Sequence, residues 1–234
     1  MYACPMCKQS LTVNAGACDW CAVKLAPDEK GAPKVVLPSV NPGKVIVGRD
    51  FGYASLPSLT SRDHKWDDGD HVDAQHDGLV LNVKDGMRWF TEPVLRMRDG
   101  VVRVLFDVLD SDVRVRVVAR KQVIGAYSLW YEMSIYPDKR SYRLSRHFSS
   151  KEHGDDTELC SGENHPLVRG LGGFNYMELR VQGPTLEGWL NGTKVCATHD
   201  ASLGIGSTAI AAGTSEKSNR RVLFRSFEVT EVAP

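Results

Sequence analysis

The sequence predicts an all-β protein in which an antiparallel β-sandwich follows a small cysteine-rich module. After residue 60, short runs of β-branched and apolar residues alternate with polar ones and are separated by turn signals. Before residue 25, four cysteines are arranged as two C-x-x-C pairs. No long segment has helical periodicity, so we expect no helical domain.

The cysteine-rich module contains Cys4-Pro5-Met6-Cys7 and, ten residues later, Cys18-Asp19-Trp20-Cys21. Pairs at this spacing bring four thiolates within tetrahedral reach of one Zn²⁺ ion, so we expect these cysteines to hold a structural zinc. The ion would let residues 1–25 fold although they have almost no core. Four thiolates leave no position for water or substrate, so catalysis there is not expected. A redox role for the C-x-x-C pairs is the alternative.

The pattern resembles short zinc-ribbon modules, because Pro5 matches their usual knuckle. Lys8 stands where such knuckles usually carry a glycine.

The bulk composition limits the partners and the location. Lys plus Arg and Asp plus Glu both total 29, so the net charge is near zero and no nucleic-acid partner is expected. The N-terminus has no basic region followed by an apolar run, and no membrane-spanning segment is expected. Four metal-bound thiols suit a reducing compartment, so we expect a cytoplasmic protein.

The chain divides into three parts. Residues 1–25 form the zinc ribbon, and residues 26–59 form a linker rich in charge, proline and glycine, with a possible short strand at Lys44–Val47. Residues 60–234 form the sandwich.

The expected strands of the sandwich follow one another at the spacing of a β-sandwich, with Asp-Gly turn signals at Asp85-Gly86 and Asp99-Gly100. The first four are Gly78–Val83, Val94–Met97, Val101–Val108 and Val113–Arg120. A hairpin follows, in which Tyr127–Tyr136 and Ser141–His147 are joined across Pro137–Arg140. The last four are Tyr176–Gln182, Leu186–Leu190, Thr193–Thr198 and Val222–Val229.

Several of these segments together resemble the concanavalin A-like lectin/glucanase superfamily, in particular its laminin-G-like jelly rolls and the 3-keto-disaccharide hydrolase-like domains. The carriers include Val104–Arg120, Tyr176–Val181, Gly188–Val195 with its Asn-Gly turn, and the closing strand Val222–Val229. The resemblance covers about residues 60–232 and implies a jelly-roll sandwich. It implies little about function, because this fold hosts lectins, peptide binders and hydrolases.

The predicted ligand-binding residues interleave aromatic rings and guanidinium groups on neighbouring strands: Trp130, Tyr142, Arg143, Arg146 and His147. Along Tyr127–Tyr136, alternate residues face the core, so we expect Trp130, Glu132 and Ser134 to be exposed on the opposite face.

A basic ladder of Arg114, Arg116, Arg120 and Lys121 faces either solvent or an acidic ligand. The connection from Ser149 to Pro166 is expected to be a long polar loop.

Other candidate sites are weaker. The acidic run at 63–77 suits calcium by composition but lacks EF-hand order, and a solvated turn is the alternative. No E-x-D-x-E strand of the glucanase kind occurs. Cys160 and Cys196 are able to pair if the fold brings them together, although nothing in their spacing requires a bridge.

We therefore expect a non-catalytic binding module that recognises a carbohydrate or a protein through one sheet face and its loops. The alternatives are a glycan-processing hydrolase of the keto-disaccharide hydrolase-like kind and a subunit of an oligomer or larger assembly.

Overall fold

The computed structural model describes residues 2–3, 10–11, 25–27, 33–35, 45–50, 72–75, 78–83, 86–150, 154–215, 217 and 219–232. Side chains are described at 78–83 and, from residue 96 onward, throughout those ranges. The predicted zinc ligands Cys4, Cys7, Cys18 and Cys21 lie outside the described residues, as does most of the acidic run at 63–77. Both ion sites therefore stay predictions.

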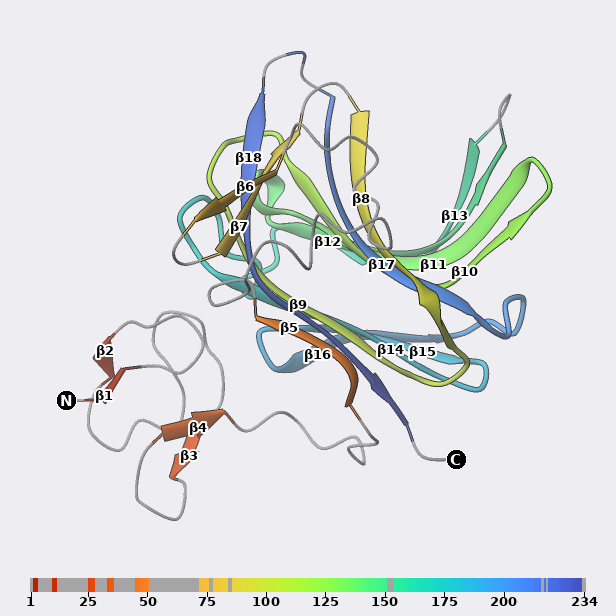
Figure 1. Ribbon diagram of the computed structural model, residues 1–234, viewed down its shortest axis with the longest axis horizontal. Coiled ribbons are helices and arrows are strands. Elements are labelled where there is room, and N and C mark those ends of the chain that lie inside the picture. The colour runs from red at the N-terminus through yellow and green to blue at the C-terminus, as the bar shows by residue number, and fades with distance from the viewer. Residues whose placement is uncertain are drawn as a thin grey trace.

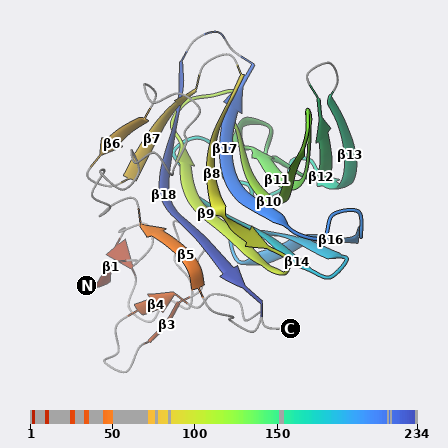
Figure 2. The ribbon, with the colours of Figure 1, turned by 45° about the vertical axis from the view of Figure 1, so that its right-hand side comes forward.

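Two antiparallel β-sheets stack as a jelly-roll sandwich (Figure 1), which confirms the predicted all-β class. The first sheet has six strands, in the order β13 (Gly154–Gly162), β12 (Ser141–Ser149), β11 (Tyr127–Tyr136), β10 (Arg114–Ile124), β17 (Gly206–Thr214) and β8 (Gly86–Met97). This sheet is curved, and its hollow side faces away from the second sheet (Figures 1 and 2).

The second sheet has eight strands. Their order is β16 (Thr193–His199), β15 (Thr185–Leu190), β14 (Asn175–Gln182), β9 (Gly100–Val108), β18 (Arg220–Glu231), β7 (Gly78–Val83) and β6 (Val72–Gln75), and β5 (Val45–Asp50) also pairs with β18. The short strand expected within the linker is thus β5, a member of this sheet. Two further strand pairs precede it: β1 (Tyr2–Ala3) with β2 (Ser10–Leu11), and β3 (Leu25–Pro27) with β4 (Pro33–Val35).

The core lies between the two sheets and is built by the period-2 alternation of the strands. On β11, Tyr131, Met133 and Ile135 face it and are fully buried, as the alternation predicts. Val104 and Phe106 of β9 and the phenylalanines of β18 pack against them from the other sheet. Burial of these apolar side chains is the main favourable term in the stability of the sandwich.

The predicted β11–β12 hairpin is confirmed, with Tyr136 paired to Ser141 across the 3-10 turn η2 (Pro137–Lys139). The Asn191-Gly192 turn also closes a hairpin, between β15 and β16, and both residues have positive φ, as a tight primed turn requires. Within the described residues, no helix is long and apolar enough to cross a bilayer.

Several details differ from the sequence predictions. β6 was not predicted, and β8 begins at Gly86, before the expected start at Val94. Asp99-Gly100 connects β8 and β9, which lie in different sheets, so this Asp-Gly signal marks a change of sheet and no hairpin. Residues 154–162, expected within a loop, form the edge strand β13. The prediction missed β17 altogether, because its alanines, glycines and serine have low β propensity.

The face of the eight-stranded sheet that points away from the core carries a buried ionic network. Arg103 Nε lies 3.2 Å from Glu178 Oε2, and Arg103 also pairs with Glu228. Arg180 Nη2 lies 3.0 Å from the same oxygen of Glu178. Arg103 thus pairs with carboxylates on both neighbouring strands, and Arg180 pairs with Glu178 within β14, so that the buried charges compensate one another.

Asp107, on the same face, is less well compensated, and burial raises its pKa to about 6, although Arg225 opposes the shift. Because the folded pKa lies above the ordinary value of 3.8, the protonated form favours folding. That contribution is fully present below pH about 4 and is lost as the pH rises through about 6. Asp107→Asn is therefore expected to be more stable than the unsubstituted protein at pH 8, by about 1–3 kcal/mol.

Urea unfolding from pH 4 to pH 8 measures this difference, which should shrink towards pH 4. A stability difference that stays the same at every pH would show that Asp107 does not titrate in this way.

Candidate functional site

The candidate site is the concave face, by which we mean the side chains of the six-stranded sheet that point away from the second sheet. Cross-strand pairing from β17 to β13 arranges them in rows. One row runs Ala211, Arg116, Ser134, Arg143 and Ser161. The next runs Ala209, Val118, Glu132, Ser145 and Glu158, and a third joins Trp130, His147 and Asp156.

The residues of β17 that belong to this face are small. Ala209 and Ala211 pair with Val118 and Arg116 of β10, so each larger β10 side chain stands beside a methyl group. Trp130, Val118 and Ala209 form a small apolar cluster on the concave face, separate from the main core. Small residues on a central strand thus leave room for the long side chains of the neighbouring strands.

Glu132 is the electrostatic centre of the face and is fully buried. Its Oε2 accepts from Arg116 Nη1 at 3.2 Å and from Trp130 Nε1 at 2.9 Å. Its Oε1 accepts from Arg114 Nη2. Two guanidinium groups and an indole N–H therefore satisfy the carboxylate, which fixes the orientation of all four side chains.

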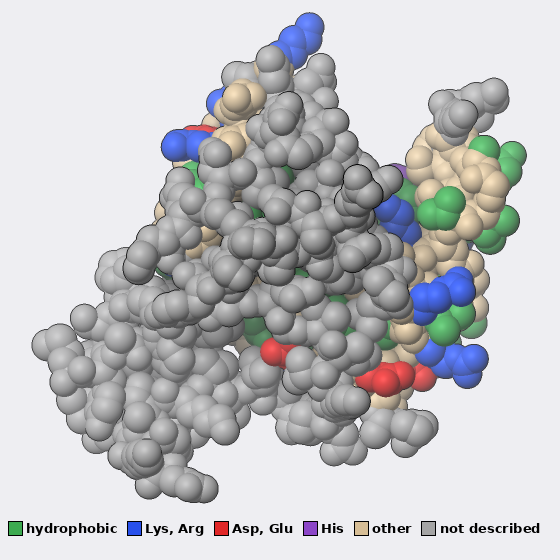
Figure 3. Space-filling model, viewed as in Figure 1, with side chains coloured by type: hydrophobic (Ala, Val, Ile, Leu, Met, Phe, Trp, Pro, Cys, Tyr) green, Lys and Arg blue, Asp and Glu red, His purple; other side chains and the backbone are tan. Residues whose placement is uncertain are grey.

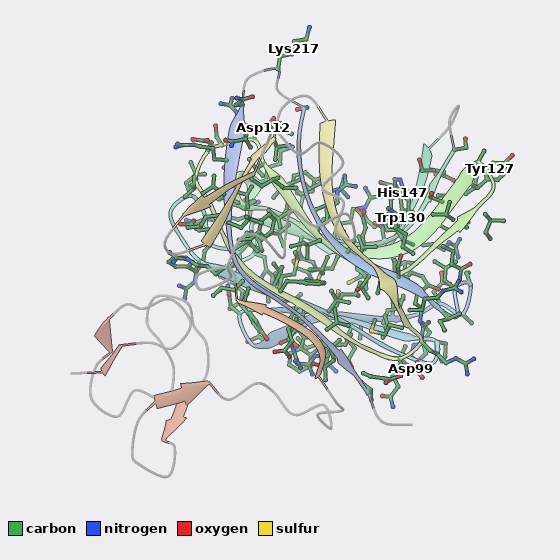
Figure 4. The ribbon with its side chains drawn as sticks, in the orientation of Figure 1. Asp99, Asp112, Tyr127, Trp130, His147 and Lys217 are labelled. Atoms are coloured by element: carbon green, nitrogen blue, oxygen red, sulfur yellow. The ribbon has the colours of Figure 1, made fainter. Side chains whose placement is uncertain are left out.

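Trp130 and His147 pair across β11 and β12, and their ring centroids lie 4.0 Å apart. Both are labelled in Figure 4, where they lie on the hollow side of the sheet. The Lys121 Nζ lies 5.7 Å from the centroid of the Trp130 ring. Burial lowers the pKa of His147, and nearby Glu132 opposes this shift.

Among the side chains that the structure describes, accessible ones of the concave face lie along β12 and β13. Arg143 Nε lies 3.3 Å from Glu158 Oε2, and Arg143 Nη1 lies 3.6 Å from Asp156 Oδ2. The side chain of Glu158 is 52% exposed and that of Arg143 is 27% exposed. His147 Nδ1 also contacts Asp156 Oδ1. Figure 3 shows a histidine and basic side chains at the base of a notch beside the lobe that holds β11 and β13.

The structure brings Trp130, Arg143 and His147 together but separates Tyr142 and Arg146 from them. Tyr142 is buried against the core, and its hydroxyl donates to the carbonyl of Val195 at 2.9 Å. Arg146 points to the same side as Tyr142, where its Nη1 lies 2.7 Å from Asp200 Oδ2. Their predicted grouping with the other three residues is wrong, because residues 142 and 146 have the opposite parity to residues 143 and 147 on one strand.

The expectation that Trp130, Glu132 and Ser134 are exposed is also wrong, although their face is correct. Their residue exposures are 4%, 0% and 0%. They are buried because long side chains from the neighbouring strands lie over them.

Sequence reasoning missed the acidic partners on β13, since Asp156 and Glu158 were expected in a loop. It also grouped Arg120 with Arg114 and Arg116 in one basic ladder. Arg114 and Arg116 reach Glu132, whereas Arg120 points elsewhere and donates to the carbonyl oxygens of Leu203 and Gly183 at 2.8 Å each. The two arginines of Arg114-x-Arg116, on the strand expected next to the one that carries Glu132, were the sequence signal that could have indicated this ion pairing.

The described carboxylates of the concave face are all held by other side chains. A glycosidase needs two carboxyl groups facing its substrate, and one of them must be free to take or give a proton. Here Glu132 is bonded to Arg114, Arg116 and Trp130, while Asp156 and Glu158 contact Arg143. Among the described residues, no cluster of three or more His, Cys, Asp or Glu side chains is arranged to hold a metal ion.

Several buried polar atoms of this face make no hydrogen bond among the described residues, including Nε of Arg114, Nε of Arg116 and Oγ of Ser145. Ser145 is fully buried, and its Oγ makes no hydrogen bond there. A buried hydroxyl without a partner costs free energy, which a ligand hydroxyl or a water molecule would recover.

No protein-family model matches the sequence, and a search of curated proteins gave no match. Solved structures do match. The carbohydrate-binding module CBM66 from Bacillus subtilis superposes with a TM-score of 0.57 at 9% identity, over 74% of this chain and 98% of its own. A Bacillus subtilis protein of unknown function with a galectin-like fold gives 0.60 at 13%, over 82% and 97%.

The κ-carrageenase from Pseudoalteromonas carrageenovora, in complex with an oligotetrasaccharide of κ-carrageenan, also superposes. Its TM-score is 0.60 at 8% identity, over 83% of this chain and 97% of that one. Identities this low indicate shared architecture only. The chain therefore has the jelly-roll sandwich fold of galectin-like and concanavalin A-like proteins.

Proposed function

We propose that the protein binds a carbohydrate on the concave face, along β12 and β13, without catalysing a reaction. The observation that carries the proposal is the cluster of Arg143, Asp156 and Glu158 beside the Trp130–His147 ring pair. Sugars present neighbouring hydroxyl groups that donate and accept hydrogen bonds. Planar guanidinium and carboxylate groups can form bidentate hydrogen bonds with such hydroxyl pairs. Aromatic rings contact the C–H faces of sugars.

The structural neighbours support a carbohydrate as the class of ligand, without indicating which carbohydrate. One is a carbohydrate-binding module, and another is a carrageenase that holds an oligosaccharide. Catalysis is not proposed, because each described carboxylate of the concave face contacts an arginine. A protein ligand on the same face is the alternative, and the experiment below separates the two.

The test is a glycan array probed with the full chain. Reproducible binding is expected, and Arg143→Gln should lower the affinity for the best glycan by about 10–100-fold, since it removes charge-assisted hydrogen bonds to hydroxyl groups. Arg146→Gln is the matched control, because it changes the same residue type on the same strand but on the opposite side. Its affinity should stay within about twofold of the unsubstituted protein.

A blank array would contradict the glycan proposal and favour a protein ligand. Equal losses in Arg143→Gln and Arg146→Gln would place the ligand elsewhere.

We also propose that a structural zinc ion is bound by Cys4, Cys7, Cys18 and Cys21. This proposal rests only on the spacing of the four cysteines in the sequence. The role of the ion is to hold the N-terminal module together, and the proposed carbohydrate site does not depend on it.

A further inference from the structure

Two cysteines meet where the edges of the two sheets approach each other. Cys160 lies on β13, the edge strand of the six-stranded sheet, and Cys196 lies on β16, the edge strand of the eight-stranded sheet. Cys160 pairs with the buried core residue Leu144, so its side chain points to the core side of the sheet. Cys196 is itself a buried core residue, 7% exposed. β13 and β16 contact each other, and Cys160 contributes to the raised pKa of the Cys196 thiol, so the two thiols are near neighbours.

The surroundings leave room for both sulfur atoms. Gly188 pairs with Cys196, and a Cβ at Gly188 would lie only 2.7 Å from Cys196 Sγ. Glycine at this position therefore allows the Cys196 thiol to lie over the β15 backbone. Tyr142 adjoins the pair: burial raises the pKa of its hydroxyl, and both thiols add to the shift. The Tyr142 hydroxyl donates to the Val195 carbonyl, beside Cys196.

We propose that Cys160 and Cys196 are the site of an inter-sheet disulfide that links β13 to β16 under oxidising conditions. The bond would tie β13, which carries Asp156 and Glu158 of the concave face, directly to the second sheet. Neighbouring cysteines on the facing edge strands of the two sheets are placed so that a disulfide between them would link the sheets. The proposal does not rest on carbohydrate binding.

Neither cysteine is in a disulfide in the structure, so the reaction removes two electrons and two protons from the pair. A low-molecular-weight disulfide such as oxidised glutathione accepts both. Cys160 is the more accessible thiol, whereas burial raises the pKa of Cys196 to about 12 and keeps it protonated.

The thiolate of Cys160 therefore attacks first. It breaks the glutathione S–S bond, forms a mixed disulfide and releases one glutathione. Cys196 Sγ then attacks Cys160 Sγ, and the second glutathione leaves with the Cys196 proton.

The test compares the full chain in oxidised glutathione with the chain in dithiothreitol. Peptide mass mapping should find the peptides that carry Cys160 and Cys196 cross-linked in the first buffer. The Tm should be about 10 °C higher there, because the bond closes a long loop of the unfolded chain.

Cys160→Ser and Cys196→Ser serve as matched controls, since any redox effect of the four N-terminal cysteines persists in both. In neither variant should oxidised glutathione produce the rise in Tm of about 10 °C over dithiothreitol that is expected for the unsubstituted protein. Cys196→Ser should accumulate a glutathione adduct on Cys160, and Cys160→Ser should show none on Cys196. Separate glutathione adducts on both cysteines of the unsubstituted protein, or no cross-linked peptide, would overturn the proposal.

Discussion

Replacing Glu132 with alanine is expected to destabilise the folded protein by about 3–5 kcal/mol, the usual cost of breaking a buried ion pair by removing one partner. Glu132 is fully buried and accepts from Arg114, from Arg116 at 3.2 Å and from Trp130 at 2.9 Å. The substitution leaves two guanidinium groups on the concave face without their counter-charge. Urea unfolding followed by circular dichroism measures the loss.

Glu158→Ala is the control for this prediction. Glu158 lies on the same face and also pairs with an arginine, but its side chain is 52% exposed, so the expected change is below about 1 kcal/mol. A loss in Glu132→Ala no larger than that in Glu158→Ala would show that Glu132 does not anchor the face.

Replacing Arg120 with methionine is the second large effect, and we expect a loss of about 3–5 kcal/mol because several buried acceptors lose their donor. Arg120 lies at the β-bulge of β10 with a positive φ of 54° and is 2% exposed. It donates to the carbonyl of Arg98 at 2.7 Å, to those of Leu203 and Gly183 at 2.8 Å each, and to Asp99 Oδ1 at 3.0 Å. The side chain thereby joins connecting segments of both sheets.

Methionine keeps the length and much of the apolar stem of arginine, so the loss reports on the hydrogen bonds more than on packing. Arg98→Met is the control, because the Arg98 side chain is exposed and its carbonyl remains to accept from Arg120. Equal unfolding midpoints for the two variants would contradict the role given to Arg120.

Most of the fold follows from local patterns. The β11–β12 hairpin was predictable because an alternating strand, a proline-containing turn and a second strand lie within about twenty residues of each other. The strands that were missed carry weak local signals. β17 consists largely of small residues and is held by two neighbouring strands, while β13 is a polar edge strand whose charges pair with β12. Tertiary pairing, which a local pattern does not record, decides both.

The candidate site was only partly predictable, for a different reason. Strand alternation assigns Trp130, Glu132 and Ser134 to one face correctly, but it carries no information on how deeply that face is buried. Applying the same alternation to β12 would have separated Arg143 and His147 from Tyr142 and Arg146. The partnership of Glu132 with Arg114 and Arg116 depends on the β10–β11 register, which the sequence alone leaves open.

The central claim is that a carbohydrate binds on the concave face beside β12 and β13. Carbodiimide labelling of carboxyl groups, with and without a saturating amount of the best glycan from the array, tests it most directly. Glu158 reports on the concave face, and Glu228, whose side chain is 30% exposed on the outer face of the other sheet, is the internal reference. The account predicts that the glycan lowers labelling of Glu158 and leaves that of Glu228 unchanged. Protection of Glu228 with Glu158 still fully labelled would contradict it.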